Sequence, residues 1–171
     1  MKRRDDPFGH GCFLIYLQII TAVLSTTAAA ACEFHGTPWA QPIFARPHGD
    51  LVRIFGVSEH PVLKVDTAHD GWDLALPANA SVMSSAPGRV SVAGRLGRLG
   101  NTVVVHHGNG WETVYGHLAR LLVKPGDCVS ATTAIGDSGA TGLAIEPTLH
   151  FGIIFEGKAV DPADYLNLRP N

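Results

Sequence analysis

Short apolar runs separated by glycine, proline and asparagine make up the chain from about residue 52 onward. Runs of this length, bounded by turn-forming residues, predict β-strands rather than helices. The expected strands are Val52–Phe55, Trp72–Leu76, Ser81–Ser84, Arg89–Ala93, Thr102–His106, Glu112–Gly116, Ala134–Ser138 and Leu149–Phe155. Many short strands at close spacing predict a mainly β fold, in which antiparallel strands form one compact domain.

Turns and helical segments add little to this pattern. Gly108-Asn109-Gly110 separates two expected strands and predicts a tight hairpin turn. Helical periodicity is nearly absent, and only two short helical turns are expected, at Ala119–Leu122 and Ala163–Leu166. The second follows Asp161-Pro162, where the aspartate can cap a helix and the proline can open it.

The last expected strand has a strictly alternating pattern. Apolar side chains on one face are Leu149, Phe151, Ile153 and Phe155, which leaves Thr148 and His150 on the other face. A face this regular predicts a core strand, so His150 would be held on a rigid support, although a histidine there can also be an ordinary sheet residue. In Glu112–His117 the same period aligns His117 with Thr113 and Tyr115 at the strand end.

A histidine and an aspartate, His69 and Asp73, lie four positions apart with Gly71 between them. Both are residue types that bind Zn²⁺. In an extended strand their Cβ atoms would be separated by roughly 13 Å, too far for a single ion about 2 Å from each ligand atom. Gly71 disfavours a helix. We therefore expect His69 on a loop, a bend at Gly71, and Asp73 on the strand that follows.

Together, His69, Asp73 and His150 would supply three ligands and leave a fourth position for water. That is the open arrangement of a catalytic zinc site. A set of two histidines and a carboxylate also binds other divalent metals, so the sequence predicts the site more firmly than the ion.

The N-terminus has the pattern of a secretory signal peptide. Lys2, Arg3 and Arg4 precede an apolar run from Cys12 to Leu24, which is followed by small residues up to Ala31. We expect residues 1–30 to be a cleaved signal peptide, residues 31–50 an extended linker and residues 51–167 the folded domain. Two alternatives are an uncleaved N-terminal anchor and a lipid attached at Cys32.

Net charge and cysteine content narrow the class of protein and its expected partners. Removing residues 1–30 takes away three basic and two acidic residues, so the net charge moves from −2 to −3. A mildly acidic chain gives no electrostatic reason to expect a nucleic-acid partner. Cys32 and Cys128 remain after cleavage, and export to an oxidising compartment would allow a disulfide between them. The alternative is a free Cys32 and a buried Cys128.

A series of short motifs along the chain resembles that of a known protein family. The motifs are His69-x-Gly71-x-Asp73, Ala86-Pro87-Gly88, Gly100-Asn101-x-Val103, His107-Gly108-Asn109-Gly110, Thr113-x-Tyr115-x-His117-Leu118, Gly139-x-Thr141-Gly142 and Pro147-Thr148-Leu149-His150-Phe151. In order and spacing this series resembles the lysostaphin/LytM-type peptidoglycan endopeptidases, over about residues 52 to 166. The resemblance implies a β-sandwich or barrel-like domain of the lysostaphin type with short helical turns. It also implies a zinc cofactor, peptidoglycan peptides as substrate, and export to the periplasm or cell envelope.

The resemblance implies roles for single residues. The metal ligands would be His69, Asp73 and His150, and His117 would be one of two catalytic histidines. The second belongs two residues before the last ligand, where this chain has Thr148. A threonine hydroxyl cannot accept a proton near neutral pH as an imidazole can, and loss of a positioned base lowers a rate by about 10²–10⁴. Glu146 is a substitute base or a surface loop residue.

Smaller departures from the family pattern surround this position. Thr132 stands where glycine is usual, Val57 where arginine is common, and Ala144-Ile145-Glu146 replaces the usual Ser-Thr-Gly. They put the loop beside the site in doubt.

The resemblance therefore leads to one expected function and one alternative to it. The expected function is a zinc metalloendopeptidase that hydrolyses peptide cross-links of peptidoglycan. The alternative is a weakened or inactive zinc-binding homologue that binds the wall or regulates other wall hydrolases, because Thr148 replaces a catalytic histidine. The spacing in Val123–Gly139 also resembles biotinyl or lipoyl carrier domains, but the lysine such a domain needs is missing from the turn.

Overall fold

The computed structural model describes Cys32, residues 49–59 and residues 66–166. The chain divides into two units, Met1–Glu33 and Phe34–Asn171, and all strands of the described residues belong to the second. The expected signal peptide and most of the expected linker lie outside the described residues. Within the described part, no helix has the length and apolar character needed to cross a membrane.

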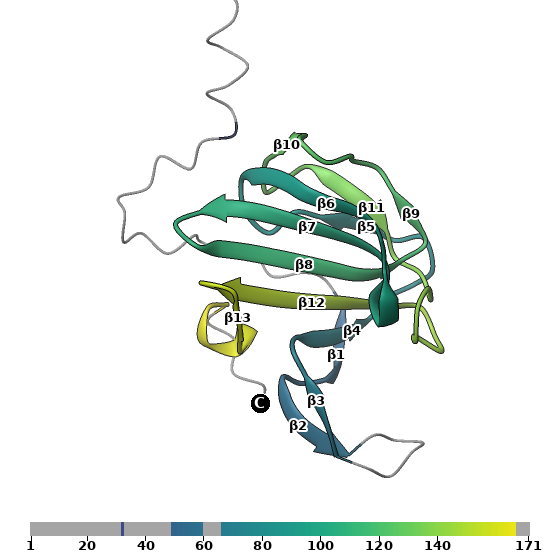
Figure 1. The fold of residues 1–171 in the computed structure, drawn as a ribbon. Helices are drawn as coiled ribbons and strands as arrows, with labels where there is room; N and C mark the ends of the chain where they lie inside the picture. Colours follow the sequence, from purple (N-terminus) through teal and green to yellow (C-terminus); the bar gives the residue numbers. More distant parts are fainter. Residues whose placement is uncertain (1–31, 33–48, 60–65, 167–171) are drawn as a thin grey trace, which may run out of the picture. The chain divides into compact units, whose positions relative to one another are not determined.

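A large antiparallel sheet forms the body of the domain (Figure 1). Its strands lie in the spatial order β1 (Asp50–Arg53), β4 (Trp72–Ala75), β12 (Thr148–Phe155), β8 (Trp111–Leu118), β7 (Gly100–Gly108), β6 (Gly88–Leu96) and β10 (Cys128–Val129), and β13 (Lys158–Val160) pairs with β12. The position of β12 between β4 and β8 places it in the interior of the sheet, as its alternating pattern predicted.

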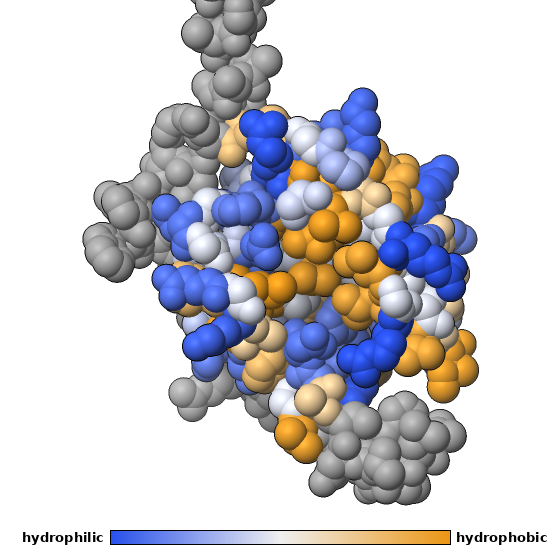
Figure 2. Space-filling model, viewed as in Figure 1, coloured by the Kyte–Doolittle hydropathy of each residue, from blue (hydrophilic) through white to orange (hydrophobic). Residues whose placement is uncertain are grey.

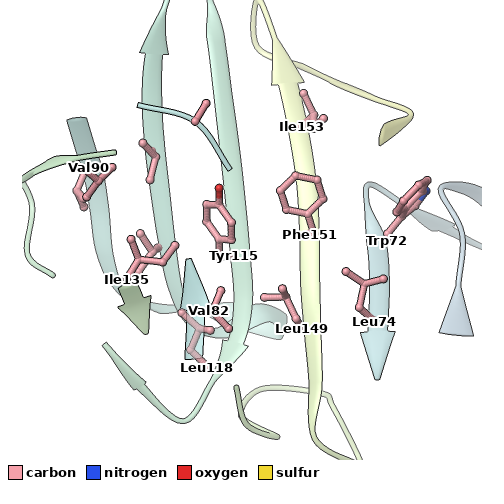
Figure 3. Close-up of a cluster of buried hydrophobic side chains, with 14 of the residues drawn as sticks. Trp72, Leu74, Val82, Val90, Tyr115, Leu118, Ile135, Leu149, Phe151 and Ile153 are labelled. Atoms are coloured by element: carbon pink, nitrogen blue, oxygen red, sulfur yellow. The ribbon is translucent and has the colours of Figure 1, made fainter. Parts of the chain in front are cut away.

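Two smaller sheets complete the fold. One consists of β5 (Ser81–Met83), β11 (Ala134–Asp137) and β9 (Arg120–Leu121), and the other is the ribbon of β2 (Gly56–Glu59) and β3 (Asp66–His69). Figure 3 shows the apolar side chains of the core, including those labelled on the large sheet together with Val82 of β5 and Ile135 of β11. The expected mainly β, antiparallel sandwich is confirmed.

The alternation predicted for β12 is confirmed by its burial. Leu149, Phe151 and Ile153 are 1%, 0% and 0% exposed and belong to the core cluster. Each buried aliphatic or aromatic side chain of this kind contributes about 1.5–3 kcal/mol to folding relative to an exposed one. The strand is therefore firmly held, and so is His150, which its backbone presents on the opposite face.

The expected turns are also present. Asn109 has φ 50° and Gly110 has φ 79°, so the β7–β8 connection uses the left-handed conformations that asparagine and glycine tolerate. A short 3₁₀ turn, η3 (Pro162–Asp164), stands where the second helical turn was expected. The Asp161 carboxylate caps it by accepting a hydrogen bond of 2.9 Å from the Ala163 backbone N–H.

Two expectations about local structure were wrong, and one element was not expected. Residues 119–122 form no helical turn: β9 pairs with β11 instead, and the Leu122 N–H donates to Ile135 O at 3.0 Å. The strand expected at Val52–Phe55 runs from Asp50 to Arg53. The 3₁₀ turn η2 (Gly97–Leu99), which links β6 to β7, was not anticipated. For β9 and β1, pairing with the distant strands β11 and β4 decided the backbone conformation, and local composition did not reveal it.

The two cysteines expected in the mature chain are both half-cystines. Cys32 and Cys128 are disulfide-bonded. Cys128, on β10, is exposed. The alternative of a free Cys32 and a buried Cys128 is therefore wrong.

Candidate metal centre

Strand register brings the predicted ligands to one place. Asp73 of β4 pairs with His150 of β12, and His150 pairs in turn with Gly116 of β8. Residues directly opposite in an antiparallel sheet point to the same face, so the carboxylate and the imidazole share the face away from the core. His69 is the last residue of β3, so the expectation of a loop was wrong. The bend at Gly71 then leads the chain into β4.

Three ligand atoms converge at this position. Asp73 Oδ1 lies 2.9 Å from His150 Nδ1 and 3.1 Å from His69 Nε2, and the two nitrogens are 3.2 Å apart. Among the described residues these three side chains form the one group of histidine, cysteine and acidic residues that could hold a metal ion. The histidines are buried and the aspartate is partly buried.

The arrangement of donors fits a cation. The Nδ1–H of His69 donates to Ile54 O at 2.8 Å, so in the neutral ring Nε2 carries the lone pair that faces Asp73. Such an outer hydrogen bond fixes the ring of a metal-binding histidine. Tetrahedral zinc with ligands at 2.0–2.1 Å has ligand atoms about 3.3 Å apart, close to the observed spacings. A cation between the three atoms would relieve the opposition of their lone pairs.

Electrostatics favour the ionised form of the carboxylate. Burial alone would raise the pKa of Asp73, but the two histidine rings outweigh it and hold the pKa well below its ordinary value, through the hydrogen bonds and charge they offer when the facing nitrogens are protonated. The carboxylate therefore stays charged throughout the neutral range and is ready to bind a cation.

Two glycines, Gly71 and Gly116, leave room for the side chain of His150. A Cβ on Gly71 would lie 2.5 Å from Phe151 O and 2.9 Å from His150 Nε2. A Cβ on Gly116 would lie 3.2 Å from the Cβ atoms of both His150 and Leu99. Gly71 is therefore needed for close approach as well as for the bend that the sequence predicted.

A β-bulge brings His117 to the same face as the three ligands. Asn101 pairs with Leu118 and Val103 pairs with Tyr115, so β8 has one residue more than β7 between these pairs. Tyr115 and Leu118 are both fully buried in the core although they are three positions apart. His117 has φ 63°, a left-handed conformation that is rare for a histidine. The alignment of His117 with Tyr115 expected from strict alternation is therefore wrong.

The His117 ring is oriented by the protein rather than by solvent. Its Nδ1–H donates to Thr141 O at 2.8 Å, and its centroid lies 6.0 Å from that of the His150 ring. The side chain is 8% exposed. Burial lowers the pKa of His117, and the hydrogen bond to Thr141 opposes that effect only in part. The ring is therefore neutral near pH 7, with Nε2 as its unprotonated nitrogen.

These side chains lie in a groove of about 740 Å³. Its lining includes His69, Asp73, His117, Thr148 and His150. The walls carry exposed apolar side chains, namely Val52, Ile54, Leu143 and Ile145. Figure 2 shows hydrophobic residues gathered between hydrophilic ones on one face of the molecule. An open groove with a few convergent polar groups is typical of a binding site.

Thr148 and Glu146 both line this groove. The Thr148 hydroxyl donates to Glu146 O at 3.0 Å, so its proton is engaged with the backbone. Glu146 is exposed. The Thr148 hydroxyl is thus directed to the backbone and not to the three converging ligands, and the place where the family has a second histidine is occupied by a hydroxyl group.

Two other described histidines lie outside the site. His106 is exposed, and its Nδ1 accepts from the Gly108 N–H at 2.9 Å. His107 is buried in the core face, where its Nδ1–H donates to Pro87 O at 2.7 Å. Burial lowers the pKa of His107 to about 4, so it is a neutral structural residue. His10, His35 and His48 lie outside the described residues.

Sequence reasoning missed Thr141 and the bulge before it. The spacing of Tyr115 and Leu118, two large apolar residues three apart at the end of a strand, was the available indication of an extra residue. The motif Gly139-x-Thr141-Gly142 was noticed, but nothing in the sequence connected it to His117.

An antiparallel β-sandwich with a His–Asp–His cluster in an open groove has the features of a metal-dependent hydrolase. Comparison with known proteins makes the class more specific. The model of Peptidase family M23 matches residues 67–162, more than half of the chain. The chain belongs to this family of metallopeptidases.

Relatives and solved structures agree with this assignment. The chain is 41% identical over 102 residues to the peptidoglycan DD-endopeptidase ShyA of Vibrio cholerae. The aligned region covers 60% of this chain and 24% of the relative. A zinc-containing peptidase of Vibrio cholerae superposes with a TM-score of 0.61 at 30% identity, over 76% of this chain and 39% of that one. The catalytic domain of lysostaphin from Staphylococcus simulans gives a TM-score of 0.61 at 28% identity, over 68% and 90%.

The aligned region is a small part of those curated relatives. This chain spans about a quarter of the length of the first ones it matches. The match therefore concerns one part of these relatives and not their whole length.

Proposed function

We propose that this protein is a zinc-dependent endopeptidase that hydrolyses peptide cross-links of peptidoglycan. The convergence of His69, Asp73 and His150 within an open groove supports this proposal most directly. Membership of Peptidase family M23 and likeness to a peptidoglycan DD-endopeptidase support the choice of substrate. The basic, then apolar, then small-residue N-terminus supports export of the protein to the periplasm or cell envelope.

We assign the metal to the three converging side chains. Zinc held there would polarise the scissile carbonyl and make a water molecule more acidic. His69 Nε2, His150 Nδ1 and a carboxylate oxygen of Asp73 are the atoms that would hold it. Three protein ligands leave a coordination position open, which a catalytic site requires and a structural site lacks.

His117 is the proposed proton carrier. Its neutral ring, with Nδ1–H engaged by Thr141 O, has Nε2 available to accept a proton from the attacking water. The water oxygen forms a bond to the carbonyl carbon, and the proton on Nε2 then passes to the amide nitrogen as the C–N bond breaks. The second proton of the water leaves the new carboxylic acid and is taken up by the amine, so the products are a carboxylate and a protonated amine. A positioned imidazole of this kind accelerates a reaction by about 10²–10⁴.

The proposal is tested by digestion of cross-linked peptidoglycan with the purified protein. We expect cross-linked muropeptides to be converted to uncross-linked ones, with chromatography and mass spectrometry as the readout. Treatment with a chelator should stop the reaction, and added zinc should restore it, because among the described residues His69, Asp73 and His150 are the one group that could hold a metal ion. A zinc-loaded preparation that cleaves no cross-link would refute the proposal.

A further inference from the structure

Next to His117, at the end of β8, the side chain of a third segment lies between β8 and its partner strand β7. In this part of the ladder Asn101 of β7 is paired with Leu118 of β8. Thr141 lies between them: the Asn101 N–H donates to Thr141 Oγ1 at 2.9 Å, and the same hydroxyl donates to Leu118 O at 2.9 Å. One hydroxyl group therefore satisfies a backbone donor and a backbone acceptor from two strands, at the β-bulge.

The backbone of Thr141 contacts His117 directly. Its carbonyl accepts the His117 Nδ1–H at 2.8 Å, and its N–H donates to His117 O at 3.4 Å. The histidine is held in the left-handed conformation, with φ 63°. Such a conformation persists only where neighbouring contacts impose it. Thr141 supplies two contacts to His117 through its backbone, and its hydroxyl binds the adjacent Leu118 O and the Asn101 N–H.

The segment that carries Thr141 has little freedom to move. The Leu143 N–H donates to Arg98 O of the turn η2 at 2.9 Å. A Cβ on Gly100 would lie 2.4 Å from Thr141 Oγ1, and one on Gly142 would lie 2.2 Å from Arg98 O. These close approaches hold the loop against the start of β7.

We infer that Thr141 is a positioning residue for His117. Its hydroxyl bonds to both β7 and β8 and so holds the Thr141 backbone in place. Its carbonyl, held in this way, accepts the proton of His117 Nδ1 and fixes the tautomer in which Nε2 is free. This inference rests on the proposed function for the role of His117 as proton carrier. The tautomer itself is a property of the fold. Without the hydroxyl, the carbonyl loses its fixed position, and the ring can rotate or shift its proton to Nε2, which cannot then accept one.

The test combines a spectroscopic readout with kinetics. In the zinc-loaded protein, ¹⁵N chemical shifts of the histidine rings at neutral pH should show His117 with its proton on Nδ1. Thr141→Val keeps the side-chain shape but removes the hydroxyl, and it should give mixed tautomers together with a fall in kcat of about 10²-fold at little-changed KM. Thr141→Ser should restore both readouts.

Two controls separate this effect from general damage. Thr132→Val makes the same substitution on an exposed residue that is hydrogen-bonded to Ser130, and it should leave the His117 spectrum unchanged. Asn101→Ala removes a side-chain bond to Ala119 O but keeps the backbone N–H that reaches Thr141, so the tautomer should also be kept.

The inference and the proposed function fail differently. If the protein cleaves no peptidoglycan but His117 has the Nδ1–H tautomer that Thr141→Val disrupts, the function is wrong and the positioning stands. If Thr141→Val retains the tautomer and the rate, the inference is overturned. A wild-type spectrum with the proton on Nε2 overturns it as well, even if the valine variant does not fold.

Discussion

Replacing Asp73 by alanine is expected to remove bound zinc and to lower the rate of cross-link cleavage by at least about 10³-fold, since a Lewis-acid metal contributes several kcal/mol to transition-state stabilisation. Asp73 Oδ1 lies within 3.1 Å of both histidine nitrogens, so the carboxylate supplies the negative charge next to both histidine ligands. Without it, only the two imidazoles remain as ligands. Metal content and kcat/KM of the same preparation are the measurements.

Asp73→Asn and Asp70→Ala are the matched variants. Asparagine keeps the size of the side chain but removes the charge, and it should lose zinc almost as fully as alanine while it preserves the fold. Asp70 is an exposed neighbour that is absent from the ligand cluster, so Asp70→Ala should keep its zinc. Equal zinc in Asp73→Ala and the wild type would show that the carboxylate is no ligand.

Introducing a histidine at position 148 is expected to raise the cleavage rate by about 10²-fold, the lower end of the effect of a positioned acid–base group, because His117 already provides one. Thr148 precedes His150 by two residues on β12 and lines the same groove, so a ring at this position would reach the reacting groups. The native hydroxyl donates to Glu146 O and offers no base.

Thr148→Gln is the control, since it adds a polar side chain of similar length that does not titrate near pH 7. It should leave the rate near that of the native protein. If the native protein is inactive and only Thr148→His cleaves, the chain is the silent homologue and not an enzyme. If histidine and glutamine behave alike, position 148 takes no part in proton transfer.

Much of the site followed from strand periodicity. The alternation along β12 was sufficient to place His150 opposite the core, because an interior strand with one buried face has a strongly specified register. The glycine between His69 and Asp73 indicated the bend, and the structure adds that its missing side chain leaves room for His150. The sequence was therefore sufficient to predict those features of the site that depend on a single strand or a single turn.

The rest depended on contacts between distant segments. His117 leaves the alternation of β8 because its ring bonds to a carbonyl 24 residues away, and no local pattern encodes that partner. β9 is two residues long and was mistaken for part of a helical turn, since its conformation comes from pairing with β11. His69 ends a polar strand, Asp66–His69, that has no apolar period of its own and is defined by its partner β2.

Anomalous X-ray diffraction from crystals of the purified protein, recorded on both sides of the zinc absorption edge, tests the central claim most directly. The account predicts a zinc peak in the groove, bound by His69 Nε2, a carboxylate oxygen of Asp73 and His150 Nδ1. A zinc peak bound elsewhere, or a His150 ring turned away from His69 and Asp73 in zinc-loaded protein, would contradict it.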